Sequence, residues 1–203
     1  SRSLAACEGA ILLVDATQGI QAQTVSNTYK ALDANLKIIP VINKIDLPNG
    51  EPEKLIDDLV NTFGFNKDEI LRVSAKTGEG VPELLDTVIS SIPYPKGNSS
   101  ATPRALVFDS MYDEFLGVVA AIRVIDGSFS KNNKYKFLAT NTVCAPEQFG
   151  IFIPKRKELE ELKTGEVGYI ATTLKDIHAV KVGDTVALNE TDTTPLPGYV
   201  EVK

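Results

Sequence analysis

Two short polar motifs are the part of this sequence best suited to chemistry. Asn-Lys-Ile-Asp (43–46) directly follows the apolar run 36–42, and Ser-Ala-Lys (74–76) ends a second apolar run. The carboxylate of Asp46 accepts two parallel hydrogen bonds, and guanine presents a matching pair of donors, its N1–H and its 2-amino group. Adenine has no such pair of neighbouring donors. The first motif therefore predicts a guanine-selective contact at Asp46.

The other residues of the two motifs have supporting roles in this interpretation. Asn43 either bonds the base or fastens neighbouring loops, and the aliphatic stem of Lys44 lies over the face of the ring. The backbone N–H of Ala75 meets the guanine O6, while Ser74 and Lys76 shape the turn. Two polar loops that only cap strands are the alternative interpretation.

The sequence around the motifs predicts the scaffold that holds them. Continuously apolar runs predict three buried strands, at 9–16, 37–44 and 70–76. Helical spacing predicts a helix after each strand, at 23–36, 51–65 and 80–92. Pro40 argues mildly against a central position for the second strand. Strands that alternate with helices predict an α/β fold with a parallel sheet, which binds ligands at the C-terminal ends of its strands.

The chain changes character near residue 93. Residues 93–103 contain three Pro, one Gly and three Ser or Thr, a composition typical of a linker. Beyond it the helical spacing disappears, and short strand-like runs separated by turn residues predict a small closed β-barrel at 104–190. We therefore expect an α/β domain at 1–92, the linker, an all-β barrel domain, and a lead into a further domain at 191–203.

Composition limits the classes of function. A chain of 203 residues that is 43% hydrophobic and 24% charged is typical of a soluble globular protein. Its net charge of −6 argues against a general basic surface for nucleic acid, so we expect no DNA partner. Cys7 and Cys144 lie far apart, which favours buried or incidental thiols in a reducing compartment over a disulfide framework.

The two polar motifs resemble the base-recognition motifs of the P-loop GTPase superfamily. Residues 1–24 resemble the stretch that follows the second switch of translational GTPases. Four later segments are similar to the LepA family, also called elongation factor 4: 108–129, 150–156, 162–185 and 195–203. The resemblance implies that the first domain is the C-terminal part of a GTP-binding domain. It also implies that the barrel is a second domain, which packs on the first and contacts the small ribosomal subunit.

The resemblance further implies GTP or GDP as the ligand, and a whole protein that hydrolyses GTP with Mg²⁺ while acting on ribosomal translocation. In the superfamily a G-x-x-x-x-G-K-[ST] loop holds the phosphates and Mg²⁺, but these 203 residues contain neither that loop nor the D-x-x-G of the second switch. The only histidine, His178, is interpreted as a loop or packing residue. We therefore expect a fragment without the N-terminal P-loop and switch segments, with no catalytic residue, no metal site and no hydrolysis of its own.

Two other functions remain open from the sequence. One is a non-catalytic pseudo-GTPase or split chain that acts as a ribosome adaptor, and the other is a different translational GTPase, such as an elongation or release factor. The basic cluster 154–157 either touches ribosomal RNA or is a solvated loop. The resemblance implies a cytoplasmic protein, with membrane association in bacteria, or a mitochondrial or plastid location, as alternatives.

The strand at 9–16 also carries a prediction about assembly. In the superfamily the strand of the P-loop lies beside it. Without that neighbour, Ile11 to Val14 form an apolar edge with unpaired backbone groups, which tends to attract another chain. The sequence therefore predicts self-association through this edge, or its coverage by residues 1–8.

Overall fold

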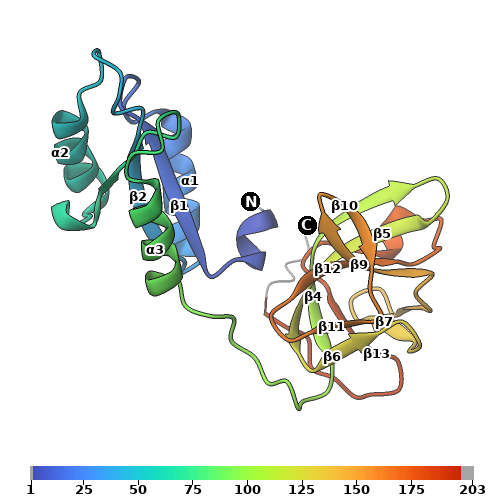
Figure 1. Ribbon diagram of the computed structural model, residues 1–203. Coiled ribbons are helices and arrows are strands. Elements are labelled where there is room, and N and C mark those ends of the chain that lie inside the picture. The colour runs from blue at the N-terminus through green and yellow to red at the C-terminus, as the bar shows by residue number, and fades with distance from the viewer. Residues whose placement is uncertain (1, 198–203) are drawn as a thin grey trace. The chain divides into compact units, whose positions relative to one another are not determined.

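The structure, a computed structural model, describes residues 2–197 and divides them into two compact units (Figure 1). The first unit runs from Cys7 to Pro93. The second begins at Tyr94 and also includes the short 3-10 helix η1 (Arg2–Ala6). Residues 198–203, the end of the expected lead into a further domain, lie outside the described residues.

Three parallel strands form the sheet of the first unit in the order β1–β2–β3, namely β1 (Gly9–Asp15), β2 (Lys37–Asn43) and β3 (Leu71–Arg72). The predicted α/β fold with a parallel sheet is confirmed. In register, Asp15 lies beside Asn43, so β1 and β2 end at the same edge. The third strand is shorter than predicted, because the N–H of Ser74 bonds to the carbonyl of Glu79 and the chain turns away from β2.

Pro40 lies inside β2, the central strand, despite lacking an N–H to donate. The N–H of Lys37 points toward β1, where it bonds to Glu8, whereas the carbonyl of Ile42 points toward β3, where it accepts from Val73. Because these directions alternate along a strand, the missing N–H of Pro40 lies on the β3 side. There β3 pairs only with Val41 and Ile42, so the proline leaves no ladder bond unmade.

Three helices cover this sheet close to the predicted ranges, namely α1 (Ala22–Asp33), α2 (Pro52–Phe63) and α3 (Val81–Ser91). A proline in the first turn starts both α2 and α3, and Gly64, with φ of 75°, ends α2 in the left-handed conformation. The helix α2 packs on one face of the sheet through Leu55, Ile56 and Leu59, against Val14 and Ile42. The helix α3 packs on the other face through Val81, Leu84 and Val88, against Ile39 and Val41.

Antiparallel strands form the second unit: β4 (Arg104–Asp113), β5 (Gly117–Asp126), β6 (Ser128–Ser130), β7 (Tyr135–Phe137), β8 (Thr142–Cys144), β9 (Gln148–Ile153), β10 (Lys155–Glu158), β11 (Glu161–Lys163), β12 (Val167–Ala171) and β13 (Thr185–Leu188). Eight of them pair in the order β10-β9-β12-β5-β4-β13-β7-β8. Phe149 near one end of this order and Cys144 at the other lie in a single core, so the sheet curls around it. The predicted all-β barrel class is confirmed. Within residues 2–197, however, no strand pairing joins β10 to β8 and closes the ladder, and β6 and β11 form a separate two-stranded sheet.

The segment expected to be a linker is attached to the second unit from Tyr94 onward. Asp126 accepts from the N–H of Asn98 at 2.9 Å and from the guanidinium of Arg104 at 2.6 and 2.9 Å. Burial raises the pKa of Asp126, but these donors outweigh it and hold the pKa below its usual value. At Gly97 a Cβ would lie 1.9 Å from the carbonyl oxygen of Ile125, so only glycine fits there. The segment is therefore held against β5.

Three further expectations concern single residues. Cys144 is a buried core thiol, and burial raises its pKa to about 12, whereas Cys7 is exposed. His178 is exposed in the short helix η3 (Ile177–Ala179), as expected of a loop residue. In the basic cluster 154–157, Arg156 bonds to Asp113 at 2.8 Å, so this residue is not simply solvated.

No helix between residues 2 and 197 is both long and apolar enough to cross a membrane. In the same part of the chain, no group of three or more His, Cys, Asp or Glu side chains is arranged to hold a metal ion.

Candidate functional site

The first polar motif forms a tight turn at the end of β2. Lys44 adopts a left-handed backbone, with φ of 66°, and its carbonyl accepts from the N–H of Leu47 at 3.2 Å. Ile45 packs against the core that α2 covers, and its N–H points to the carbonyl of Val73. Because the apolar residue of the motif is anchored in the core, Lys44 and Asp46 on either side of it are left for polar contacts.

The second motif begins a loop that closes on itself around Ser74. The N–H of Ser74 donates to the carbonyl of Glu79 at 2.9 Å, and its own carbonyl accepts from Gly78 at 2.8 Å. Its hydroxyl oxygen accepts from the N–H of Thr77 at 3.2 Å. Ser74 is fully buried. The hydroxyl is therefore held in one position by the fold of the loop.

That hydroxyl connects the two motifs. The Ser74 Oγ donates to Asp46 Oδ1 at 2.7 Å, although 28 residues separate the two in sequence. An ionised carboxylate has about four acceptor positions, and this bond occupies one of them. The half-buried carboxylate of Asp46 is thus oriented while it keeps acceptor positions for a bidentate donor pair.

Asn43 fastens three chain segments at this edge of the sheet. Its Oδ1 accepts from the N–H of Ala75 at 3.0 Å, and its carbonyl accepts from the N–H of Ala16 at 2.9 Å. Of the two roles predicted for Asn43, the structure contains the fastening of neighbouring loops. The N–H of Ala75, expected to meet the guanine O6, points to Asn43 instead. Lys76 is exposed and makes none of these contacts.

Lys44 is held by a residue outside both motifs. Its Nζ lies 2.5 Å from Oδ2 of Asp15, the last residue of β1. Oδ1 of Asp15 accepts from the N–H and the hydroxyl of Thr17, at 2.8 and 2.7 Å. The bond from Lys44, followed by the two from Thr17, lowers the pKa of Asp15 to about 2. Neither Asp15 nor Thr17 was predicted from the sequence to belong to the site. The signal that could have found them is that Asp15 ends a strand parallel to β2, which brings it to the same edge of the sheet.

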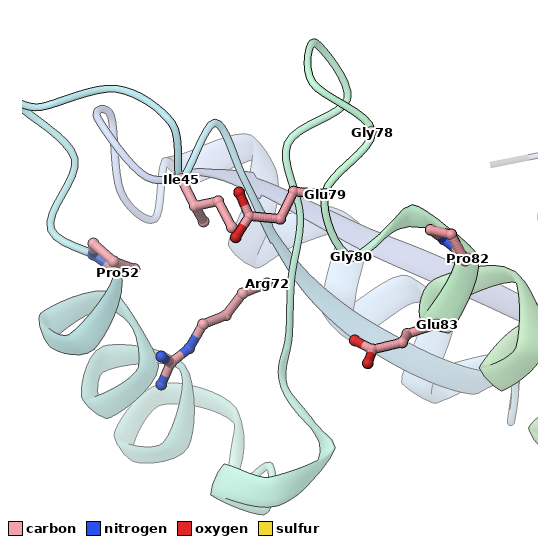
Figure 2. Close-up of a pocket in the computed structure, with 8 residues that line it drawn as sticks. All are labelled: Ile45, Pro52, Arg72, Gly78, Glu79, Gly80, Pro82 and Glu83. Carbon is pink, nitrogen blue, oxygen red and sulfur yellow. The ribbon is translucent and has the colours of Figure 1, made fainter.

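A pocket of about 700 Å³ lies next to these loops (Figure 2). Ile45 from the first loop and Glu79 from the second both line it. Arg72, on another wall, binds Glu53 of α2 through two contacts of 2.7 and 3.2 Å. None of the six residues of the two predicted base-recognition motifs that were assigned to the guanine site lines this pocket. The candidate base contacts therefore lie beside the pocket, in the loops that follow β2 and β3.

Comparison with known proteins finds a matching family and individual relatives. Residues 1–94 match the family described as the elongation factor Tu GTP binding domain. A protein named elongation factor 4 from Corynebacterium urealyticum is 52% identical over 100% of this chain and 33% of its own length. A protein of the same name from Bifidobacterium animalis subsp. lactis is 49% identical over 98% of this chain and 32% of its own length. The chain thus spans about a third of these relatives.

Among solved structures, the chain is similar to the apo form of translation elongation factor SelB from Methanococcus maripaludis. The TM-score is 0.74, with 92% of this chain and 41% of that chain covered. The identity is 22%, so this likeness shows the fold alone. By its sequence identity of about half to both relatives along almost its entire length, the chain belongs to the elongation factor 4 (LepA) family.

Proposed function

We propose that this chain supplies the guanine-selecting part of the GTP site of a translational GTPase. The observation that carries this proposal is the 2.7 Å bond from buried Ser74 to Asp46 at the C-terminal edge of a parallel sheet. It orients the carboxylate to accept from N1–H and the 2-amino group of guanine. The stem of Lys44 covers the ring face, and Asn43 holds the two loops together.

In this proposal the full-length gene product binds GTP and GDP, hydrolyses GTP with Mg²⁺ and acts on the ribosome in the cytoplasm. Its support is the match to a GTP binding domain and the elongation factor 4 relatives. The phosphate contacts and Mg²⁺ belong to the full-length protein, because these 203 residues contain no Gly-Lys-Ser or Gly-Lys-Thr. We expect the 203-residue chain by itself to bind guanine nucleotides weakly and to show no turnover.

The second unit supplies the contact with the small ribosomal subunit. Lys155 and Lys157 are exposed on β10, whereas Arg156 between them is held by Asp113. The two lysines are therefore available for phosphate contacts. Changing both to Ala should weaken cosedimentation of the full-length protein with small subunits, and the difference from the unchanged protein should shrink as the salt concentration rises. Unchanged cosedimentation would assign the contact to another surface.

The base site is tested by calorimetric titration of the full-length protein with GDP, IDP and ADP. IDP lacks only the 2-amino group, so we expect it to bind about 10- to 100-fold more weakly than GDP, and ADP more weakly still. Equal affinity for GDP and ADP would contradict the proposal.

The geometry of Asp46 is tested by Ser74→Ala, with Thr77→Ala as the matched control. Ser74→Ala removes the hydroxyl that orients Asp46, so the preference for GDP over IDP should fall about fivefold. Thr77→Ala removes only a hydroxyl that accepts from the N–H of Glu79. It should leave the preference unchanged. A Ser74→Ala protein with full preference would show that Asp46 needs no such orientation.

A further inference from the structure

Asp15 belongs to neither motif, yet it binds Lys44, whose long flexible side chain is proposed to cover the face of the base. The side chain of Asp15 is 18% exposed, and that of Lys44 is 48% exposed. Their charged atoms lie 2.5 Å apart. The contact is therefore close and partly shielded from water at the carboxylate end.

The position of Asp15 is fixed independently of Lys44. It ends β1 directly beside Asn43, and its Oδ1 is held by the N–H and hydroxyl of Thr17. Its carbonyl accepts from Gln18 at 3.1 Å and from Gly19 at 3.0 Å. The carboxylate is thus an immobile anchor, whereas a free lysine side chain has rotamer entropy to lose when it is ordered.

We propose that Asp15 is a positioning residue, which holds the ammonium of Lys44 at the end of β1 so that the lysine stem covers the face of the bound purine. This inference rests on the proposed function. It gives the base site a third component, contributed by a strand that carries neither motif. Asp15 itself touches no base and acts through Lys44.

The proposal divides recognition into two separable parts. Contact between the Lys44 stem and the ring face does not depend on the substituents at the ring edge. Asp46, in contrast, reads the edge that carries the 2-amino group. Loss of Asp15 should therefore weaken the binding of GDP and of IDP by the same factor. The ratio of the two affinities should stay the same as in the unchanged protein.

The test uses Asp15→Asn in the full-length protein. Asparagine keeps an oxygen for the two Thr17 donors and loses the charge that holds Lys44. We expect both GDP and IDP to bind about two- to fivefold more weakly, with the GDP-to-IDP ratio unchanged. Asp15→Glu keeps the charge and should recover part of the affinity. Asp33→Asn, the matched control, makes the same change in an exposed carboxylate at the end of α1 and should retain wild-type affinity.

A double-mutant cycle separates positioning from a structural role of Asp15. Lys44→Met keeps an apolar stem without the ammonium, so adding Asp15→Asn to it should cause no further loss. An equal loss in both backgrounds would overturn the inference. A GDP affinity that Asp15→Asn leaves unchanged would also overturn the inference. If the variant in that case keeps the wild-type preference for GDP over IDP, the proposed function still stands. Absence of that preference in the unmutated protein would overturn both.

Discussion

At the scale of single residues, the candidate site is made of groups that are fixed before any base arrives. Asp46 is oriented by Ser74, and Lys44 is held by Asp15. Asn43 connects the loops through Ala75. Such preorganisation lowers the ordering cost of binding, because few side chains remain to be immobilised when a ligand enters.

The Asp15–Lys44 contact predicts a specific dependence on pH. The pKa of Asp15 is lowered from 3.8 to about 2, with Lys44 as the largest cause. Because the folded pKa is depressed, the contact stabilises the fold fully above pH 3.8 and loses this effect as the pH falls toward 2. Lys44→Met should move the pKa of Asp15 upward toward 3.8, as followed by the carboxyl-carbon NMR shift. A midpoint that stays near 2 would assign the lowered pKa to Thr17 instead.

Part of this site could be predicted from the sequence, because the chemistry of single residues indicated it. Asp46 and Ser74 could be predicted because each stands in a short motif after an apolar run. Asp15 could not be assigned a role in the same way, since its contact depends on the register of β1 against β2 and on the left-handed backbone of Lys44. The bond between Ala75 and Asn43 likewise depends on how closely two loops approach in space.

At the scale of elements, the site depends on how α2 and the sheet pack beneath the first loop. Ile45 of that loop joins the core formed by Leu55, Ile56 and Leu59 of α2. Movement of α2 would therefore be transmitted to Lys44 and Asp46 on either side of Ile45. The helices were predictable because prolines and Gly64 mark their ends. The strand order of the second unit was not, since it arises from contacts far apart in the chain.

Leu59→Ala tests the α2 core. Leu59 is fully buried, so its truncation should lower the free energy of unfolding of the first unit by about 2–5 kcal/mol. Leu85→Ala on α3, where the side chain is 57% exposed, should cost less than about 0.5 kcal/mol. Urea unfolding followed at 222 nm reports on this unit, because α1, α2 and α3, the α-helices of residues 2–197, all lie in it. Equal midpoints for the two variants would contradict the assigned core.

At the scale of the whole molecule, the first unit presents an apolar strand at the end of its sheet. β1 is the terminal strand, and Ile11 and Leu13 on it are 46% and 56% exposed. The helix η1, part of the segment expected as an alternative cover, groups with the second unit. An unprotected apolar edge favours pairing with another chain.

We therefore expect the 203-residue chain to self-associate through β1. Leu13→Lys places a charge on this strand and should shift sedimentation velocity profiles toward monomer. Val167→Lys on β12, a similarly exposed apolar position on a strand that is paired on both sides, should leave the profile unchanged. A wild-type chain that stays monomeric, with fast-exchanging amides from Ile11 to Val14, would contradict this expectation.

The most direct test of the central claim changes the one group that is proposed to select guanine. Asp46→Asn replaces a carboxylate oxygen with an amide donor, which suits the C2 oxo group of xanthine and no longer the 2-amino group of guanine. In the full-length protein, GDP should bind about 10- to 100-fold more weakly and xanthosine diphosphate more tightly, while Asp33→Asn on α1 changes neither. An Asp46→Asn protein whose preference for GDP is unchanged would contradict the account.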